Sequence, residues 1–171
     1  MSIRQIISSI LIVFLFNGCY STGLKIFHKD AIFEKGFQYT KKADLVQNHQ
    51  VKLMMIATYL NPVDKKYKDN RENLIVGIYF SNSDVDEKNY IKRGYDFNIT
   101  NAQDIQIKKL SRDDKLLVNL PLKNSWADYY RLSYIYDDSN ETKSNRDKVI
   151  IKLENNSTKT NIIKITFDRL L

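Results

Sequence analysis

Apolar and polar residues alternate with a period of two along much of the chain after residue 39. Tyr95, Phe97 and Ile99 fall on one side of this alternation, and polar residues separate them. The segment 128–136 alternates in the same way. Its residues expected to face the core are Tyr130, Leu132, Tyr134 and Tyr136. Successive side chains of a β-strand point to opposite faces of a sheet, so this pattern predicts strands that bury one face.

Further strands are expected where short segments rich in apolar residues are bounded by turn residues. They cover residues 39–47, 51–60, 74–81, 105–107, 115–122, 149–153 and 162–167. Asn48-His49 is expected to turn the first hairpin, and Asn61-Pro62 to end its second strand. The polar stretch 63–73 is expected to be a loop. One short helix is expected over 31–38, with Asp30 as its N-cap.

These elements indicate an all-β fold. The strands are short, and no long amphipathic helix separates them, which argues against a parallel sheet built from βαβ units. The spacing favours an antiparallel immunoglobulin-like β-sandwich of about 7–9 strands, and a small closed β-barrel is the alternative. Cys19 is the only cysteine, so no disulfide can form within the chain and the fold depends on its core.

The first nineteen residues follow a different pattern. Arg4 is a short positive region, and an apolar run from Ile6 to Phe16 follows it. This run is shorter than the about 20 apolar residues that span a bilayer, and it matches the apolar region of a secretory signal. The next residues, Phe16-Asn17-Gly18-Cys19, resemble the lipobox of bacterial lipoproteins. The resemblance implies that residues 1–18 are removed and that Cys19 carries the lipid.

We therefore expect three parts in the chain. Residues 1–18 are the predicted signal peptide, residues 19–38 a lipidated tether with the short helix, and residues 39–171 the β-sandwich domain. The resemblance implies a lipid-anchored protein of the bacterial cell envelope. Tyr20 stands where an Asp would resemble the inner-membrane retention signal of enteric bacteria, which favours the outer membrane. Abundant Asn, Lys and Ile resemble the composition that an AT-rich genome gives, such as that of a Campylobacter-like bacterium. Together with the lipobox, the chain resembles a small exported lipoprotein of such bacteria.

The net charge of +7 narrows the expected partners. An exported chain meets little nucleic acid, so we predict no nucleic-acid partner. Anionic lipid headgroups or envelope glycans are the candidates for a basic surface. The alternative is that lysines only keep the surface soluble, and the mixing of both charge signs along the chain favours it.

The residues needed for catalysis or metal binding are scarce. The only histidines are His28, near the tether, and His49, in a predicted turn. They give a histidine cluster or a catalytic triad almost nothing to draw on; His49 is expected to be a solvated turn residue, with a role as a base the alternative. The isolated glycines form no phosphate-binding loop. Two acidic stretches, 84–87 and 137–141, lack the Gly and Glu of a calcium loop and are expected to be solvated turns. We predict no enzyme, cofactor or metal, although two carboxylates meeting in space stay an alternative.

Two other features suggest sites. Trp126 and Tyr129 are a candidate contact surface, because exposed Trp and Tyr often anchor binding. Tyr129 lies on the face opposite Tyr130 and is expected to be exposed, and packing in the core is the alternative for both contact residues.

Three segments also read acid-x-Asn-x-Thr, which resembles the extended glycosylation sequon of Campylobacter-type bacteria. Their acceptors are Asn98, in a predicted strand, and Asn140 and Asn156, in predicted loops.

The tether, the β pattern and the thin catalytic inventory predict a binding or structural interaction module whose partner is an envelope protein or glycan. The alternative is a periplasmic or surface protein that binds a small ligand or glycan. A flat apolar contact surface would favour the first function, and a concave aromatic cleft the second.

Overall fold

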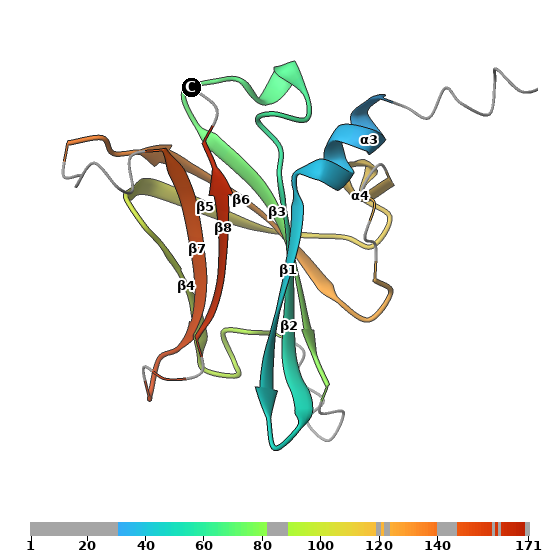
Figure 1. Ribbon diagram of the computed structural model, residues 1–171, viewed down its shortest axis with the longest axis vertical. Helices are drawn as coiled ribbons and strands as arrows, with labels where there is room; N and C mark the ends of the chain where they lie inside the picture. The colour runs from blue at the N-terminus through green and yellow to red at the C-terminus, as the bar shows by residue number, and fades with distance from the viewer. Residues whose placement is uncertain are drawn as a thin grey trace, which may run out of the picture. The chain divides into compact units, whose positions relative to one another are not determined.

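Figure 1 shows a computed structural model of the chain. The structure describes residues 31–81, 89–118, 121, 124–139, 147–158, 160 and 162–169. The chain divides into two units, Met1–Ala31 and Ile32–Leu171, and the second unit holds the β-domain. The predicted signal peptide, Cys19 and the sequon asparagine Asn140 lie outside the described residues. In the described part of the chain, no helix has the length and apolar character needed to cross a membrane.

The described strands form two antiparallel sheets. The five-stranded sheet has the order β1 (Thr40–Gln47), β2 (Gln50–Tyr59), β3 (Glu72–Phe80), β6 (Asp128–Tyr136), β5 (Ala102–Leu110). The three-stranded sheet has the order β4 (Tyr95–Ile99), β7 (Lys148–Asn155), β8 (Ile163–Asp168). The prediction of an all-β antiparallel sandwich is confirmed, and these strands do not join into the single closed sheet of the barrel alternative.

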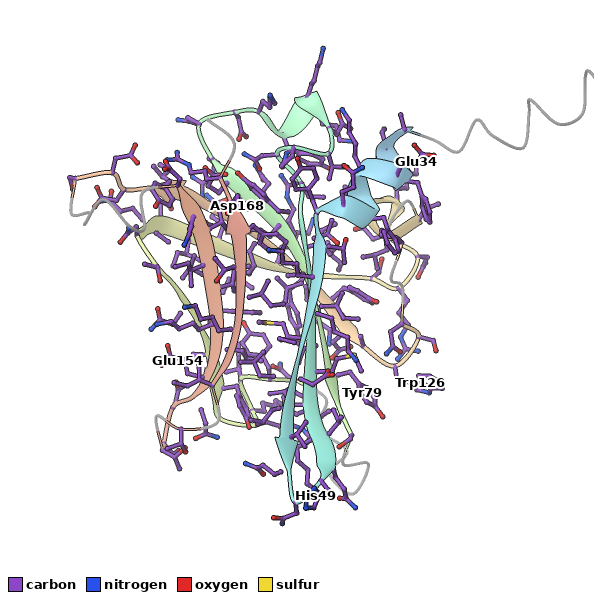
Figure 2. All side chains as sticks on the ribbon, in the orientation of Figure 1. Glu34, His49, Tyr79, Trp126, Glu154 and Asp168 are labelled. Carbon is purple, nitrogen blue, oxygen red and sulfur yellow. The ribbon has the colours of Figure 1, made fainter. Side chains whose placement is uncertain are left out.

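The β1–β2 hairpin turns at the predicted residues. Asn48 and His49 both have positive φ, at 50° and 61°. Two consecutive residues in this left-handed region make the tight turn whose twist matches that of the flanking strands, and Asn tolerates it well. Gln47 and Gln50 close the ladder on either side. His49 is therefore an exposed residue at a hairpin tip, which is labelled in Figure 2.

The main core lies between the two sheets. Tyr130, Leu132, Tyr134 and Tyr136 all belong to it, as their alternation predicts. Tyr95 and Phe97 of β4 pack against it from the opposite sheet, and the Tyr90 ring meets the Tyr130 ring edge-on with centroids 4.9 Å apart. Full burial of one such side chain stabilises the fold by about 1.5–3 kcal/mol. The core therefore holds the sheets together without a disulfide.

A second apolar cluster covers the outer face of the five-stranded sheet. Its buried members are Leu60, Tyr67, Ile75, Leu110, Leu117, Ala127 and Tyr129. Tyr67 comes from the 3₁₀ helix η1 (Lys65–Tyr67), which lies in the predicted loop 63–73, and Leu117 comes from α4 (Lys115–Val118). The five-stranded sheet is thus buried on both faces where this cluster lies.

The predicted strand over 115–122 is wrong, because its described start is the helix α4. Asp114 begins this helix: its carboxylate accepts a hydrogen bond from the backbone N–H of Leu116 at 2.9 Å. Its carbonyl accepts from the N–H of Leu117 at the same distance. The helical turn points Leu117 into the outer cluster, where it is fully buried. A short apolar run in the sequence does not distinguish a buried strand from a buried helical turn. Here the packing of Leu117 in the outer cluster selects the helical turn.

The helix predicted over 31–38 is confirmed as α3 (Ala31–Gln38). Its end is fixed by Thr40, whose hydroxyl donates to the carbonyl of Gly36 at 2.6 Å. Phe33 is half-buried, whereas Phe37 is 62 % exposed. The predicted N-cap, Asp30, lies outside the described residues.

Candidate functional site

Trp126 lies on a short turn just before β6, and its side chain is 69 % exposed. Asn124 organises this turn. Its side-chain oxygen accepts from the backbone N–H of Trp126 at 2.8 Å, and its carbonyl accepts from the N–H of Ala127 at 3.3 Å. The backbone N–H of Asn124 in turn donates to the hydroxyl oxygen of Tyr129 at 2.6 Å. The exposed indole therefore stands on a turn that three hydrogen bonds hold in place.

Tyr129 is buried, with 4 % of its surface exposed, so the prediction that it is an exposed contact residue is wrong. The prediction assumed that β6 buries one face, but the outer cluster covers the second face as well. Gly77, opposite Tyr129 in the register of β3 and β6, makes room for the ring. A Cβ at Gly77 would lie 2.7 Å from a ring carbon of Tyr129, so a larger residue there would displace it.

The two residues of the predicted contact surface therefore have different roles. Tyr129 positions the turn, because its hydroxyl oxygen accepts a hydrogen bond from the backbone N–H of Asn124. Burial raises the pKa of that hydroxyl. Trp126 is the residue available for contact. Tyr79 is half-buried against the outer cluster, and Figure 2 shows Tyr79 and Trp126 on the same side of the β-domain in that view. Lys109 and Asp128 form an ion pair at 2.9 Å beside the start of β6.

Two of the three sequon asparagines lie in the described residues, and both are exposed. Asn98 is in the edge strand β4 and faces Lys152 in the register, so its backbone belongs to a ladder as predicted. Asn156 follows the end of β7 in a turn. Its side-chain amide donates to the carboxylate of Asp96 at 2.6 Å, which is the acidic residue of the Asn98 sequon. Both acceptors line one shallow hollow together with Asp96 and Glu154. Modification of Asn140, Asn156 or Asn98 stays a prediction.

The described residues contain no group of three His, Cys, Asp or Glu side chains that could hold a metal ion. In the acidic stretch that begins at Asp137, that carboxylate accepts from the N–H of Ser139 at 2.9 Å and from its hydroxyl at 2.5 Å. These two hydrogen bonds lower the pKa of Asp137. The part of this stretch that the structure describes is a local turn at the surface.

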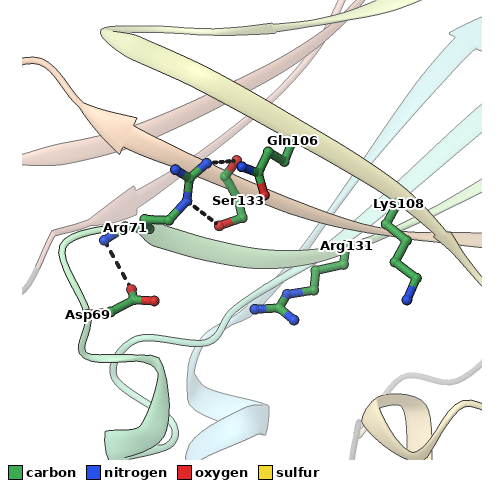
Figure 3. A pocket seen from close by; sticks show the side chains of 6 residues that line it. All are labelled: Asp69, Arg71, Gln106, Lys108, Arg131 and Ser133. Carbon is green, nitrogen blue, oxygen red and sulfur yellow. Dashed lines mark hydrogen bonds between the residues drawn. The ribbon is translucent and has the colours of Figure 1, made fainter.

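The sequence analysis missed a basic hollow on the outer face of the five-stranded sheet (Figure 3). Its lining residues are Asp69, Arg71, Gln106, Lys108, Arg131 and Ser133. They come from the loop before β3, from β5 and from β6, three segments far apart in the sequence. In the sequence, the only local signal for this hollow is the pair Arg131 and Ser133, two polar residues at outward positions of β6. Polar residues are also typical of a strand face that is open to solvent, so this pair does not by itself indicate a binding site.

Comparison of the chain with protein-family models, with curated proteins and with solved structures gives no match in any of the three.

Proposed function

We propose that this chain is a lipid-anchored protein of the bacterial cell envelope whose β-sandwich acts as a binding or structural interaction module. Cys19 would carry the lipid, the outer membrane is the favoured location, and Trp126 would anchor the contact with an envelope protein. The proposal includes no catalytic step. The observation that carries the contact is a 69 % exposed indole on a turn fixed by three hydrogen bonds.

Such a turn favours binding for two physical reasons. A Trp side chain offers a large apolar area, and Trp is enriched among the few residues that dominate the free energy of protein association. The hydrogen bonds through Asn124 order the backbone before a partner arrives, which reduces the entropy lost on binding. A lipid tether would favour binding in a further way, because it raises the effective concentration of the domain at the membrane. A modest affinity for the partner then suffices.

Site-specific photo-crosslinking in cells tests this proposal. A photoreactive residue would replace Trp126 in one variant and Val46 in a control variant, since Val46 is also strongly exposed, at 56 %, but lies in the β1–β2 hairpin. We expect position 126 to crosslink to a defined envelope protein that position 46 does not capture. Equal capture from both positions, or none from position 126, would contradict the proposed contact. Capture of a glycan from position 126 would instead support the glycan-binding alternative.

A substitution separates contact from packing. Trp126→Ala should abolish capture by a photoreactive residue placed at the neighbouring Ser125, while the thermal midpoint stays within about 2 °C of the parent, because an exposed side chain contributes little to stability. A large drop in the midpoint would assign Trp126 to packing and remove it from the proposed contact.

A further inference from the structure

The basic hollow on the outer face of the five-stranded sheet has a volume of about 230 Å³. Three of its lining side chains are cations, Arg71, Lys108 and Arg131, and one is a carboxylate, Asp69. Figure 3 shows these side chains around the hollow, with Asp69 and Arg71 from the loop before β3, Lys108 from β5 and Arg131 from β6. Its residues are separate from those of the Trp126 turn.

Two of the cations are direct neighbours across the sheet. Lys108 on β5 lies opposite Arg131 on β6 in the antiparallel register. Residues paired in this way hold their Cβ atoms about 5 Å apart on one face, and like charges there repel each other. In the described residues no ion pair joins a carboxylate to either cation: Asp128 pairs with Lys109, and Asp104 pairs with Arg71. The pair Lys108 and Arg131 therefore keeps an excess of positive charge.

The guanidinium of Arg131 is held in place but is not saturated with hydrogen bonds. One terminal nitrogen donates to the side-chain oxygen of Asn73 at 3.0 Å, and the group lies over the Tyr67 ring, 5.8 Å from its centroid. Its Nε is buried and has no hydrogen-bond partner. A guanidinium offers five N–H donors, so Arg131 keeps donors that no described residue accepts.

Arg71 has a different role, because each of its three guanidinium nitrogens already donates to a described residue. Its Nε donates to the Ser133 hydroxyl at 2.9 Å, and its Nη1 donates to the Asp104 carboxylate at 2.6 Å. Its Nη2 donates to the carbonyls of Asp104, at 2.6 Å, and Ser133, at 3.1 Å. Since the Ser133 oxygen accepts from Arg71, the hydroxyl proton of Ser133 is free to be donated elsewhere. Arg71 is thus a scaffold that orients a hydroxyl donor on the wall of the hollow.

We propose that this hollow binds an oxyanion of the phosphate type between Arg131 and Lys108. The planar guanidinium suits two oxygens of one phosphate, and the Lys108 ammonium acts as a point charge on a third. Ser133 and the amide of Gln106 supply neutral donors on the same wall. The Asp69 carboxylate repels the anion, so its negative charge limits the affinity of the hollow for phosphate. The same chemistry fits free phosphate, a phosphate monoester, or the phosphodiester of a lipid headgroup.

Titration calorimetry on the purified full chain in a neutral detergent tests the site. The probes are inorganic phosphate and glycerophosphoglycerol, the water-soluble phosphodiester headgroup of phosphatidylglycerol, with sodium acetate as a carboxylate control. We expect one saturable site for at least one phosphate probe. Lys108→Gln and Arg131→Gln should each weaken it about tenfold or more, because each removes a charge-assisted hydrogen bond. Asp69→Asn should strengthen it while keeping the oxygen that accepts from the Arg71 N–H.

Lys164→Gln is the matched control, because it removes one positive charge from an exposed position on β8 of the other sheet. It should leave the affinity unchanged. Binding of only one phosphate probe supports the site and identifies the source of the anion. Three outcomes would overturn the proposal: no saturable binding of either probe, equal weakening by Lys164→Gln and Lys108→Gln, or acetate binding as tight as phosphate. Lys108 is exposed, so its variant remains informative if Arg131→Gln fails to fold.

Discussion

Two buried tyrosines, Tyr59 and Tyr134, test whether hydrogen-bond satisfaction or ring packing governs the stability of the core. Their side chains are 1 % and 0 % exposed, so removal of either hydroxyl leaves a buried ring of the same shape. The Tyr59 hydroxyl donates to the Glu72 carboxylate at 2.5 Å. The Tyr134 hydroxyl is buried without a partner in the described part of the chain. The changes Tyr59→Phe and Tyr134→Phe therefore differ in one physical quantity, the hydrogen bond that is lost.

The magnitudes follow from the surroundings of Glu72. This carboxylate is 6 % exposed, and its other oxygen accepts from Nε of Arg169 at 2.7 Å. Loss of a hydrogen bond to a buried charged acceptor costs about 1.5–3 kcal/mol, so Tyr59→Phe should lower the free energy of unfolding by that amount. Tyr134→Phe removes a hydroxyl that was desolvated without compensation, so we expect no loss of stability and a gain of up to about 1 kcal/mol.

Urea unfolding of residues 20–171, followed by far-UV circular dichroism, measures both variants under the same conditions. For a domain of this size, 1 kcal/mol corresponds to about 2–4 °C in the thermal midpoint, so in a thermal scan the two variants should separate by at least about 3 °C. Equal destabilisation by both changes would refute the reasoning, because it would mean that the hydroxyl partner does not set the cost. If the slope of the free energy of unfolding against urea concentration is the same in both variants and the parent, the variants unfold from the same fold.

Three further predictions concern the outer cluster, the titration of the core and the anchor. Gly77→Ala should cost about 1–3 kcal/mol by overpacking against the Tyr129 ring, and Trp126 fluorescence should shift as the turn moves; an unchanged spectrum and stability would contradict the close approach. Burial raises the pKa of Tyr59 and Tyr134 above the ordinary value of 10.0. The folded state then keeps protons that the unfolded state releases, so stability should be full below about pH 10 and fall above it. Chemical denaturation between pH 8 and 11.5 measures this, and a flat profile would count against it. Cys19→Ala should abolish metabolic labelling with an alkyne fatty acid and release the protein from membranes; persistent labelling would contradict lipidation at Cys19.

The period-two pattern predicted strands whose two faces differ in polarity, and short apolar runs bounded by turn residues predicted strands buried on both faces, such as β3. In β4 and β8, apolar residues face the main core and polar residues face outward, so the period-two pattern alone locates them. The turn at Asn48-His49 could also be predicted from local sequence alone, because few residue types tolerate positive φ. The segment at 115–122 gave no such contrast. Its leucines suit a strand and a helical turn alike, and only their contact with the outer face of the sheet decides between them.

The candidate sites were predictable to different degrees. Trp126 was a candidate contact residue with core packing as the alternative, and its 69 % exposure argues against core packing. The hollow was not predictable, since residues 69–71, 106–108 and 131–133 meet only through the strand order β3, β6, β5. The opposition of Lys108 and Arg131 depends further on a register that shifts at an irregularity between Gln103 and Gln106. No local pattern in the sequence fixes such a shift.

The error at Tyr129 has a physical explanation that links the two sites. Outward positions of β6 carry Tyr129, Arg131 and Ser133, and each has a different neighbour: the turn of Asn124, the cation Lys108 and the scaffold Arg71. Residues two apart in a strand lie about 7 Å from each other, so one face of β6 supports both the Trp126 turn and the hollow. A strand covered on both faces carries large apolar residues on both, as the tyrosines at 129 and 130 do. An apolar residue on the polar side of an alternating strand therefore indicates a second packed layer rather than an exposed contact.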